Sequence, residues 1–481
     1  MKNWKWLSVL TLASMSQFAC SKTQIQRTSN PPQNEIVVSN TDSVNLLVQY
    51  IKSEGIQDIP KVTLATIPHG LINGTTYSAY GTFQSHYQKV VSNKNGIFAA
   101  FLSKYVVNEL DSRNDLGTWQ VVRSEDGGQT FKTIYSLTTS SKAPCLETDN
   151  DGNIYLAHAM NRWEDMTFSK LLYSENFEKP HSVLVLGAGA GKYSCAFNES
   201  EKQFLYLGWS KFVRIDTNSM NVIDHRQFFS SGPDGHPQYP HLVFEPEQKT
   251  LLAAWTTVSV NEINGRSNYL DARYAISRDN GLSWKSPSNG SNLNLPIVVD
   301  DTGGAPTALL ATDLSDAKSS QQQGVALENW LDSVAFIGDY FYFAYINTGL
   351  DHSNYSTRYT RTSLRSDETM TPVALEKFKG ETIELNSNGL YFTTQTLPGI
   401  GSVLYAVGAT ENFEIASLYS FDKGVTWHDH AIGEREVHQP YAITGSKHLT
   451  SDGYIIGEYT SYPLAGESEG KVKFFKIKGR I

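Results

Sequence analysis

Three copies of one eight-residue pattern constrain the fold of this chain more than any other feature. The pattern is Ser-x-Asp-x-Gly-x-(Thr or Ser)-aromatic, and it covers residues 124–131, 277–284 and 420–427. Asp and Gly favour a tight turn between two strands, and the Ser and Asp side chains bond nearby backbone amides. The aromatic ring then returns to an apolar face. We therefore interpret the aspartates of these octets as structural turn residues rather than catalytic ones: Asp126, Asp279 and Asp422.

A second unit recurs with a spacing near 50 residues. It consists of an apolar strand, a turn and another apolar strand, and it covers residues 87–101, 143–158, 193–207 and 239–255, with weaker copies starting near Leu331, Leu390 and Gln439. Seven hairpins at this spacing predict an all-β chain, a seven-bladed β-propeller of four-stranded antiparallel blades. The octets then lie between the outer two strands of blades 1, 4 and 6.

The last repeat supplies only about three strands. Residues 61–67 are apolar and close to the N-terminus, and we expect them to add the missing fourth strand and close the ring. The sequence thus predicts a single propeller domain over residues 41–481.

The first residues have the pattern of an export signal. Two lysines precede a short apolar stretch that ends at Phe18-Ala19-Cys20, too short for a membrane span. We expect residues 1–20 to be a lipoprotein signal peptide with a lipid on Cys20, although Gln17 departs from the aliphatic residue usual at that position; plain secretory cleavage is the alternative. Residues 21–40 are polar and predict a flexible tether. The expected location is the outer membrane, facing the periplasm or the cell exterior, with no other membrane contact.

The amino-acid composition limits the classes of molecule that the protein is expected to bind. The net charge of −9 argues against general nucleic-acid binding. Aromatic residues make up 12% of the chain, and Tyr and Trp suit both sheets and the stacking of sugar rings. We expect a monomer that binds a carbohydrate.

Aligning the hairpins brings several polar side chains to one end of the expected channel. Tyr193 and Tyr239 share one position of the innermost strand, and His241 follows two residues later on the same face. The second strands end at the same opening, where we expect His158, Arg162 and Lys211, and His86 enters from blade 1. Each of these residues alone is compatible with core packing or a backbone hydrogen bond. Their convergence is what indicates a site.

Cys145 and Cys195 occupy matching positions in adjacent blades, and His241 has that position in the next blade. The sequence leaves three interpretations open: a disulfide, a zinc site with Cys145, Cys195 and His241 as ligands, or two inert buried thiols. There is no CxxC or HExxH motif to favour a metal further. We expect no required cofactor, and a structural Zn or Ca ion is compatible with the fold.

The octets resemble the Asp-box (BNR) repeats of the sialidase-like propeller superfamily. Sialidases hold a carboxylate with three arginines and use a Tyr nucleophile. They also have an Arg-Ile-Pro motif, for which this chain has Thr66-Ile67-Pro68. The missing arginine and the count of seven blades rather than six make a sialidase-like glycoside hydrolase the weaker alternative.

Residues 87–98, 238–242 and 298–303 resemble the seven-bladed ulvan lyases, and the similarity runs across most of residues 60–480. The resemblance implies cleavage of a sulfated polysaccharide at a uronic acid by β-elimination. It also implies that His, Tyr and Arg side chains of neighbouring blades do the chemistry.

Applied to this chain, the resemblance makes His158, Tyr193, Tyr239 and His241 the candidate catalytic residues and His86, Arg162 and Lys211 the candidate substrate-binding residues. Trp209 stands where an Arg would suit the carboxylate. A propeller that binds an anionic glycan without cleaving it is the alternative from another class.

Overall fold

The computed structural model describes residues 55–480, with gaps at 141, 233–234, 264–265, 287–289, 300–307, 310–326, 338–339, 350–355, 364–375, 387–388 and 398–400. Cys20, the expected signal peptide 1–20 and the expected tether 21–40 lie outside these residues. The described chain is nearly all-β, with only three short 3-10 turns, η1 (Ser112–Asn114), η2 (Asn161–Trp163) and η3 (Tyr173–Glu175). None of its helices is long or apolar enough to cross a bilayer.

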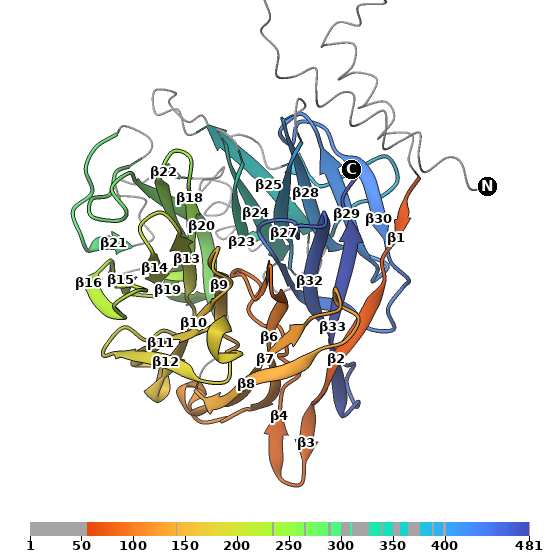
Figure 1. Cartoon of the computed structure of the whole chain (residues 1–481), viewed down its shortest axis with the longest axis horizontal. Helices are drawn as coiled ribbons and strands as arrows, with labels where there is room; N and C mark the ends of the chain where they lie inside the picture. The colour runs from red at the N-terminus through yellow and green to blue at the C-terminus, as the bar shows by residue number, and fades with distance from the viewer. Residues whose placement is uncertain are drawn as a thin grey trace, which may run out of the picture.

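The strands form small antiparallel sheets that follow one another in chain order around a common centre (Figure 1). The first three of these sheets are β5 (Val90–Asn93), β6 (Gly96–Val106), β7 (Leu116–Ser124) and β8 (Lys132–Thr139); β9 (Cys145–Thr148), β10 (Ile154–Met160), β11 (Asp165–Leu171) and β12 (Pro180–Val185); and β13 (Ser194–Asn198), β14 (Gln203–Leu207), β15 (Lys211–Asp216) and β16 (Asn221–Gln227).

The next three sheets have the same plan. They are β18 (Gly235–Glu245), β19 (Thr250–Ile263), β20 (Arg266–Ser277) and β22 (Ala308–Leu309); β23 (Leu327–Ile337), β24 (Tyr340–Gly349), β25 (Ser356–Ser363) and β26 (Glu376–Lys377); and β27 (Tyr391–Leu397), β28 (Gly401–Ala409), β29 (Ile415–Ser420) and β30 (His428–Ile432). β1 (Gln57–Asp58) adds to β30 in parallel, and β17 (Phe229–Ser231) pairs in parallel with β21 (Ile297–Val299).

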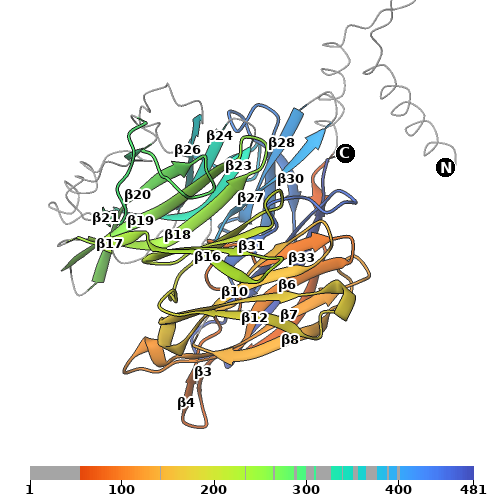
Figure 2. The same cartoon turned by 60° about the vertical axis from the view of Figure 1, so that its left-hand side comes forward.

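The last sheet joins both ends of the described chain. It contains β31 (Pro440–Gly445), β32 (Tyr454–Ser461) and β33 (Glu469–Lys478), and its fourth strand is β2 (Lys61–Pro68), which pairs antiparallel with β33. The predicted closing strand is therefore confirmed. The hairpin of β3 (Gly70–Ile72) and β4 (Thr75–Tyr77) follows β2 and projects from the body (Figures 1 and 2).

The first strand of each sheet lies beside the first strand of the next. β5 contacts β9, the series continues through β13, β18, β23 and β27 to β31, and β31 contacts β5 again. The seven predicted hairpins thus appear as the first two strands of seven sheets within the described residues.

Alternate residues of a strand pack against different neighbouring sheets. In β14, Phe204 and Tyr206 join a core cluster with the preceding sheet, whereas Leu205 and Leu207 join a cluster with the following one. A strand whose side chains point alternately to two faces, both buried, is apolar at every position, which explains the run Phe-Leu-Tyr-Leu.

The octets at 124–131 and 420–427 connect third and fourth strands, and the octet at 277–284 begins the longer connection that follows the third strand β20. In the last of them, Ser420 Oγ donates to Asp422 Oδ1 at 2.8 Å, and the amide of Gly424 donates to Ser420 Oγ at 2.8 Å. The amide and hydroxyl of Thr426 also donate to the carboxylate of Asp422, at 2.8 and 2.6 Å. The octets of Asp126 and Asp279 repeat these bonds. Gly424 has φ +76°, which an L side chain resists.

Candidate active site

Each antiparallel sheet has one end where its first strand begins and its second strand ends, opposite the octets. We call this end the mouth. Between the first strands lies a narrow cavity of ≈ 40 Å³, lined from several sheets by residues that include His86, His241, Ser333 and Thr444. At its far side Lys447 forms an ion pair with Glu147, 2.7 Å from Nζ to the carboxylate.

Residues 80–88 cross the mouth before they enter β5, and we call them the crossing segment. The amide of Thr82 donates to Thr460 Oγ1 of β32 at 2.8 Å. Gln84 Nε2 donates to the carbonyl of Gly191, before β13, at 3.1 Å. These partners belong to sheets that are not adjacent, so the segment spans the opening and places its side chains over the centre.

His86 of the crossing segment is the hub of the site. Its ring centroid lies 5.4 Å from those of both Tyr239 and His241. Its Nε2 lies 3.1 Å from the carbonyl oxygen of Tyr193, so Nε2–H is the donor. In the neutral ring Nδ1 then keeps its lone pair, and this buried atom has no hydrogen-bond partner among the described residues.

Burial keeps both imidazoles of the mouth neutral. Burial lowers the pKa of His86 well below its ordinary value, and the positive charges of Lys89 and Lys192 add to that effect. Burial also lowers the pKa of His241, to about 4. A neutral imidazole at neutral pH accepts a proton.

His241 contacts backbone carbonyls with both ring nitrogens. Nδ1 lies 2.8 Å from the carbonyl oxygen of Tyr239, and Nε2 lies 3.1 Å from that of Asp332. The β18–β19 ladder shifts register between Gln238 and His241, and Tyr239 has φ +48°. This bulge re-aims the side chain of Tyr239, as bulges do next to active sites. His241 therefore braces the bulge, whereas His86 keeps a free nitrogen.

Lys192 brings a positive charge to the same place. Its Nζ lies 3.6 Å from the ring centroid of Tyr239 and 2.5 Å from Gln238 Oε1. Burial, with a smaller contribution from the charge of Lys142, lowers the pKa of Lys192 to about 7. Burial raises the pKa of Tyr239 well above its ordinary value, and Tyr269 adds to that rise, so the phenol stays protonated.

Asp332 holds the crossing segment from the far side. Ser85 Oγ donates to its Oδ1 at 2.5 Å, and the amide of Leu390 donates to its Oδ2 at 2.6 Å. Since Ser85 precedes His86 and the Asp332 carbonyl faces His241, one buried residue contacts both the crossing segment and His241. Burial raises the pKa of Asp332 to about 7.

Lys192 and Asp332 were absent from the sequence-based candidates. A signal for Lys192 was present, because the residue before the aligned inner-strand position is His86, Lys142, Lys192 and Gln238 in the first four hairpins. This column faces the mouth. Asp332 has no such signal, since its partners lie far away in the sequence.

Two of the predicted catalytic residues lie in the walls. Tyr193 is fully buried, its hydroxyl donates to the carbonyl of Ala143 at 3.2 Å, and its own carbonyl holds His86. His158 packs its ring against Trp119 of β7, with centroids 4.9 Å apart. None of the contacts of His158 within the described residues reaches His86 or Tyr239, and burial lowers its pKa to about 4.

Arg162 and Lys211 lie at the rim. The guanidinium of Arg162 is half exposed and pairs with Asp111 Oδ2 at 2.5 Å. Lys211 begins β15 and is partly exposed. The structure thus brings His86, Tyr239 and His241 together, while Arg162 and Lys211 stay outside this group.

Cys145 and Cys195 form a disulfide between the first strands of neighbouring sheets, with Cα atoms 6.2 Å apart. Both sulfurs are therefore taken, and the zinc site of Cys145, Cys195 and His241 is wrong for these cysteines. The described residues contain no group of three or more His, Cys, Asp or Glu side chains arranged for a metal.

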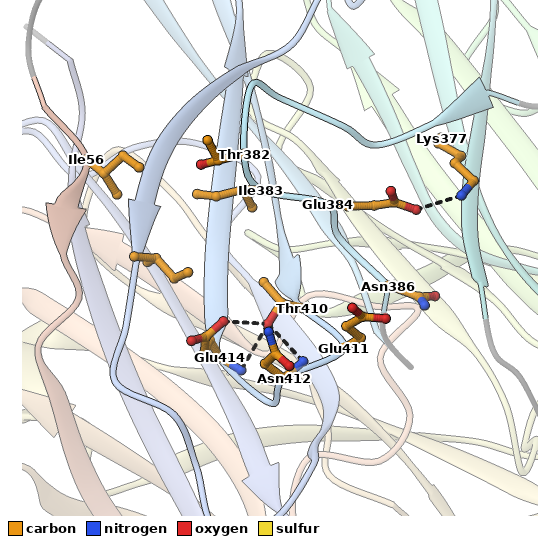
Figure 3. Close-up of a pocket in the computed structure, with 11 residues that line it drawn as sticks. Ile56, Lys377, Thr382, Ile383, Glu384, Asn386, Thr410, Glu411, Asn412 and Glu414 are labelled. Carbon is orange, nitrogen blue, oxygen red and sulfur yellow. Dashed lines mark hydrogen bonds and ion pairs between the residues drawn. The ribbon is translucent and has the colours of Figure 1, made fainter.

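A larger pocket of ≈ 530 Å³ lies between β26 and the loop that joins β28 to β29 (Figure 3). Glu384 pairs there with Lys377 at 2.8 Å, and Glu414 accepts from Thr410 at 2.8 Å. With Glu411 beside them, three carboxylates face one ammonium. The larger cavity is therefore poorly suited to a polyanion, in contrast to the lysine-bearing mouth.

Comparison with known proteins finds no matching family model and no similar curated sequence. Solved structures do match. One titled as a new family of polysaccharide lyase, "PL25-Ulvanlyase", has a TM-score of 0.54 at 11% identity over 84% of this chain and 95% of that chain. The same lyase bound to -[GlcA(1-4)Rha3S]- gives 0.54 and 11% over 86% and 95%. The polysaccharide lyase Uly1 gives 0.51 and 12% over 88% and 100%. The chain therefore has a fold similar to that of these polysaccharide lyases.

Proposed function

We propose that the protein is a polysaccharide lyase that cleaves a sulfated, uronate-containing polysaccharide by β-elimination, on a seven-bladed β-propeller closed by its N-terminal strand. One observation carries the proposal: the neutral imidazole of His86, the protonated phenol of Tyr239 and the ammonium of Lys192 meet at the mouth. The similarity of fold to ulvan lyases supports it.

β-Elimination at a uronate needs three groups. A cation must neutralise the carboxylate so that the neighbouring C5 proton becomes acidic, and Lys192 supplies that charge. A base must take the proton, and the free Nδ1 lone pair of His86 does so. An acid must protonate the leaving oxygen, and the Tyr239 phenol does so.

The bonds balance without a further reactant. The C5–H and C4–O bonds break and a C4–C5 double bond forms, while His86 gains one proton and Tyr239 loses one. After the product leaves, His86 gives its proton to solvent and the Tyr239 phenolate takes one from solvent, which restores both groups. His241 keeps Tyr239 in place through the bulge rather than reacting itself.

The test is incubation with a sulfated uronate polysaccharide while near-ultraviolet absorbance of the unsaturated product is recorded. We expect His86→Ala and Tyr239→Phe each to slow the reaction by roughly 10³-fold, the scale of general acid–base catalysis. Tyr173→Phe, in the exposed turn between β11 and β12 at the octet end, is the matched control and should keep the wild-type rate.

Other outcomes separate the alternatives. Sugar release without absorbance would indicate a sialidase-type hydrolase, and tight binding with neither would indicate a glycan-binding protein. Wild-type rates in both His86→Ala and Tyr239→Phe would remove the assignment of roles.

We further propose that the mature protein is exported and held at a membrane surface by a lipid on Cys20, as a monomer that needs no metal and binds no nucleic acid. The Cys145–Cys195 disulfide supports an oxidising compartment. Cys20→Ser should move the protein from the membrane fraction to the soluble fraction, and full activity in EDTA is expected.

A further inference from the structure

A group of half-buried aromatic rings lies next to the site and takes no part in the proposed chemistry. We call Tyr80, Phe83, Tyr441 and Tyr462 the aromatic platform. Tyr80 stacks on Phe83 with ring centroids 4.9 Å apart, and Phe83 lies parallel to Tyr441 at 6.0 Å. Tyr441 contacts Tyr462 at 5.3 Å.

The aromatic platform is continuous with the candidate active site. Tyr80 and Phe83 belong to the crossing segment, and Phe83 is three residues before His86. Tyr441 lies in the first strand of the last sheet, and Tyr462 follows its second strand, so all four rings lie at the mouth. A polymer with one sugar at His86 therefore has its next units within reach of these rings.

Lys142 adds a positive charge to the aromatic platform. Its side chain is almost fully buried, and its Nζ lies 5.3 Å from the ring centroid of Tyr80 and 5.6 Å from that of Phe83. Nζ also donates to the hydroxyl of Tyr105, which in turn donates to Asp115 at 2.5 Å. The stem and position of Lys142 are thus fixed by the protein, beside rings that are not fully covered.

The position of Lys142 in the repeats matches that of Lys192. Both residues come just before the aligned inner-strand position, in adjacent sheets, and the charge of Lys142 is felt at Lys192. Two positive charges that act on each other repel, and an anion bound at either ammonium group relieves that repulsion. Aromatic faces with adjacent cations suit pyranose rings that carry an anionic substituent.

We propose that the aromatic platform is a binding subsite for a sugar next to the scissile uronate, and that Lys142 pairs with the carboxylate or sulfate ester of that sugar. This subsite rests on the proposed lyase function. It implies that the bound polymer runs from the point of cleavage toward the last sheet.

The first experiment measures KM on the polysaccharide. Tyr441→Ala should raise KM about five- to tenfold with kcat little changed, because ring contacts of this kind contribute modestly to binding. Tyr441→Phe should restore the wild-type KM, since it keeps the ring. Tyr173→Ala at the octet end is the control and should change nothing. A wild-type KM in Tyr441→Ala overturns the aromatic part of the proposal.

The second experiment identifies the anion. Equilibrium binding is measured with the Tyr239→Phe variant, in which turnover is roughly 10³-fold slower. The variant is compared with and without Lys142→Met, on the sulfated polymer and on its desulfated form. A loss of affinity of about fivefold for the sulfated polymer alone assigns a sulfate ester to Lys142. An equal loss on both polymers assigns a carboxylate, and no loss on either overturns the role of Lys142. Lys179→Met, an exposed lysine at the octet end, is the control.

The two proposals fail in different ways. If unsaturated product forms but the platform variants keep wild-type KM, the subsite is wrong and the lyase stands. If no product forms yet Tyr441→Ala and Lys142→Met weaken binding, the lyase is wrong, and the aromatic platform stands as a glycan-binding surface.

Discussion

The two ends of the sheets satisfy their polar groups in opposite ways. At the octet end, Asp422 accepts hydrogen bonds from Ser420 and Thr426, two and four residues away. At the mouth, the carboxylate of Asp332 accepts from Ser85, 247 positions away, and from the amide of Leu390, 58 positions away. One residue type thus makes a local turn at one end and a long-range brace at the other.

This difference indicates that the octet end serves mainly stability, whereas the mouth serves mainly function. A local turn forms wherever its few residues occur, so it repeats unchanged in three sheets. A brace exists only when distant strands are already in place, and it holds groups such as His86 that no single sheet could orient. Substitutions that remove a link between sheets should therefore disturb the mouth. Substitutions that remove a hydrogen bond within a turn should disturb only the octet end.

The largest effect is expected from the disulfide, which links sheets over a separation of 50 residues. Replacement of Cys145 and Cys195 by Ala together should lower the free energy of unfolding by about 4 kcal/mol, because the closed loop restricts the unfolded chain. Denaturant unfolding measures this. Reductant should bring the wild type down to the level of the double variant and leave the variant unchanged. If full reduction left the free energy of unfolding of the wild type unchanged, the disulfide would not stabilise the fold in this way.

The brace comes next. Asp332→Asn should lower kcat/KM about 100-fold, which is the cost of misplacing a reacting group by about 1 Å. The pH profile of the remaining activity should also shift, because His86 is no longer held in the same surroundings. Ser85→Ala should have a similar effect.

A double-mutant cycle decides whether the two residues act together. The double variant of Asp332 and Ser85 should be no slower than the slower single variant, since both changes cut one link. Additive losses would mean that the two side chains act on the site separately.

A substitution that removes a hydrogen bond within an octet should affect stability alone. Asp422→Ala removes the acceptor of the turn and should cost about 1–2 kcal/mol of unfolding free energy, similar to the loss of a cap. kcat and KM should stay at wild-type values. A fall in kcat without unfolding would show that the octet end also controls the mouth.

The smallest effect concerns pH. Lys192 carries its charge below its pKa of about 7, so uronate binding is strongest at low pH and weakens as pH rises. KM should rise about fivefold from pH 7 to pH 8, as the charged fraction falls from about a half to about a tenth. kcat should change by no more than about twofold, because His241 and His86 are neutral throughout this range and only Asp332, with a pKa of about 7, goes from about half to about nine-tenths ionised. A KM that falls over the same range would exclude Lys192 as the carboxylate partner.

The same contrast explains what the sequence could predict. The octets, the seven hairpins and the closing strand depend on neighbouring residues and on a regular repeat, and the structure has all of them. Tyr239 and His241 were found because strand periodicity places them on the channel face. His86 was found only as a binding residue, since its hub position follows from the crossing segment.

The misplaced candidates have equally physical causes. His158 lies near the end of the second strand β10, but its side chain points to the neighbouring sheet and packs on Trp119. The spacing of residues along a strand predicts which side chains share a face. The packing of the neighbouring sheet decides whether that face is buried or lines the channel. Asp332 and its partners meet only in the folded chain.

The pairing of β2 with β33 bears on how the protein is made. β2 leaves the ribosome long before β33, because nearly all of the described strands lie between them in the sequence. Until β33 has been made, the backbone of β2 lacks this partner and offers a template to other chains. The sheet therefore cannot be completed early in synthesis, and the interval before β33 emerges is when the nascent polypeptide most needs chaperone protection.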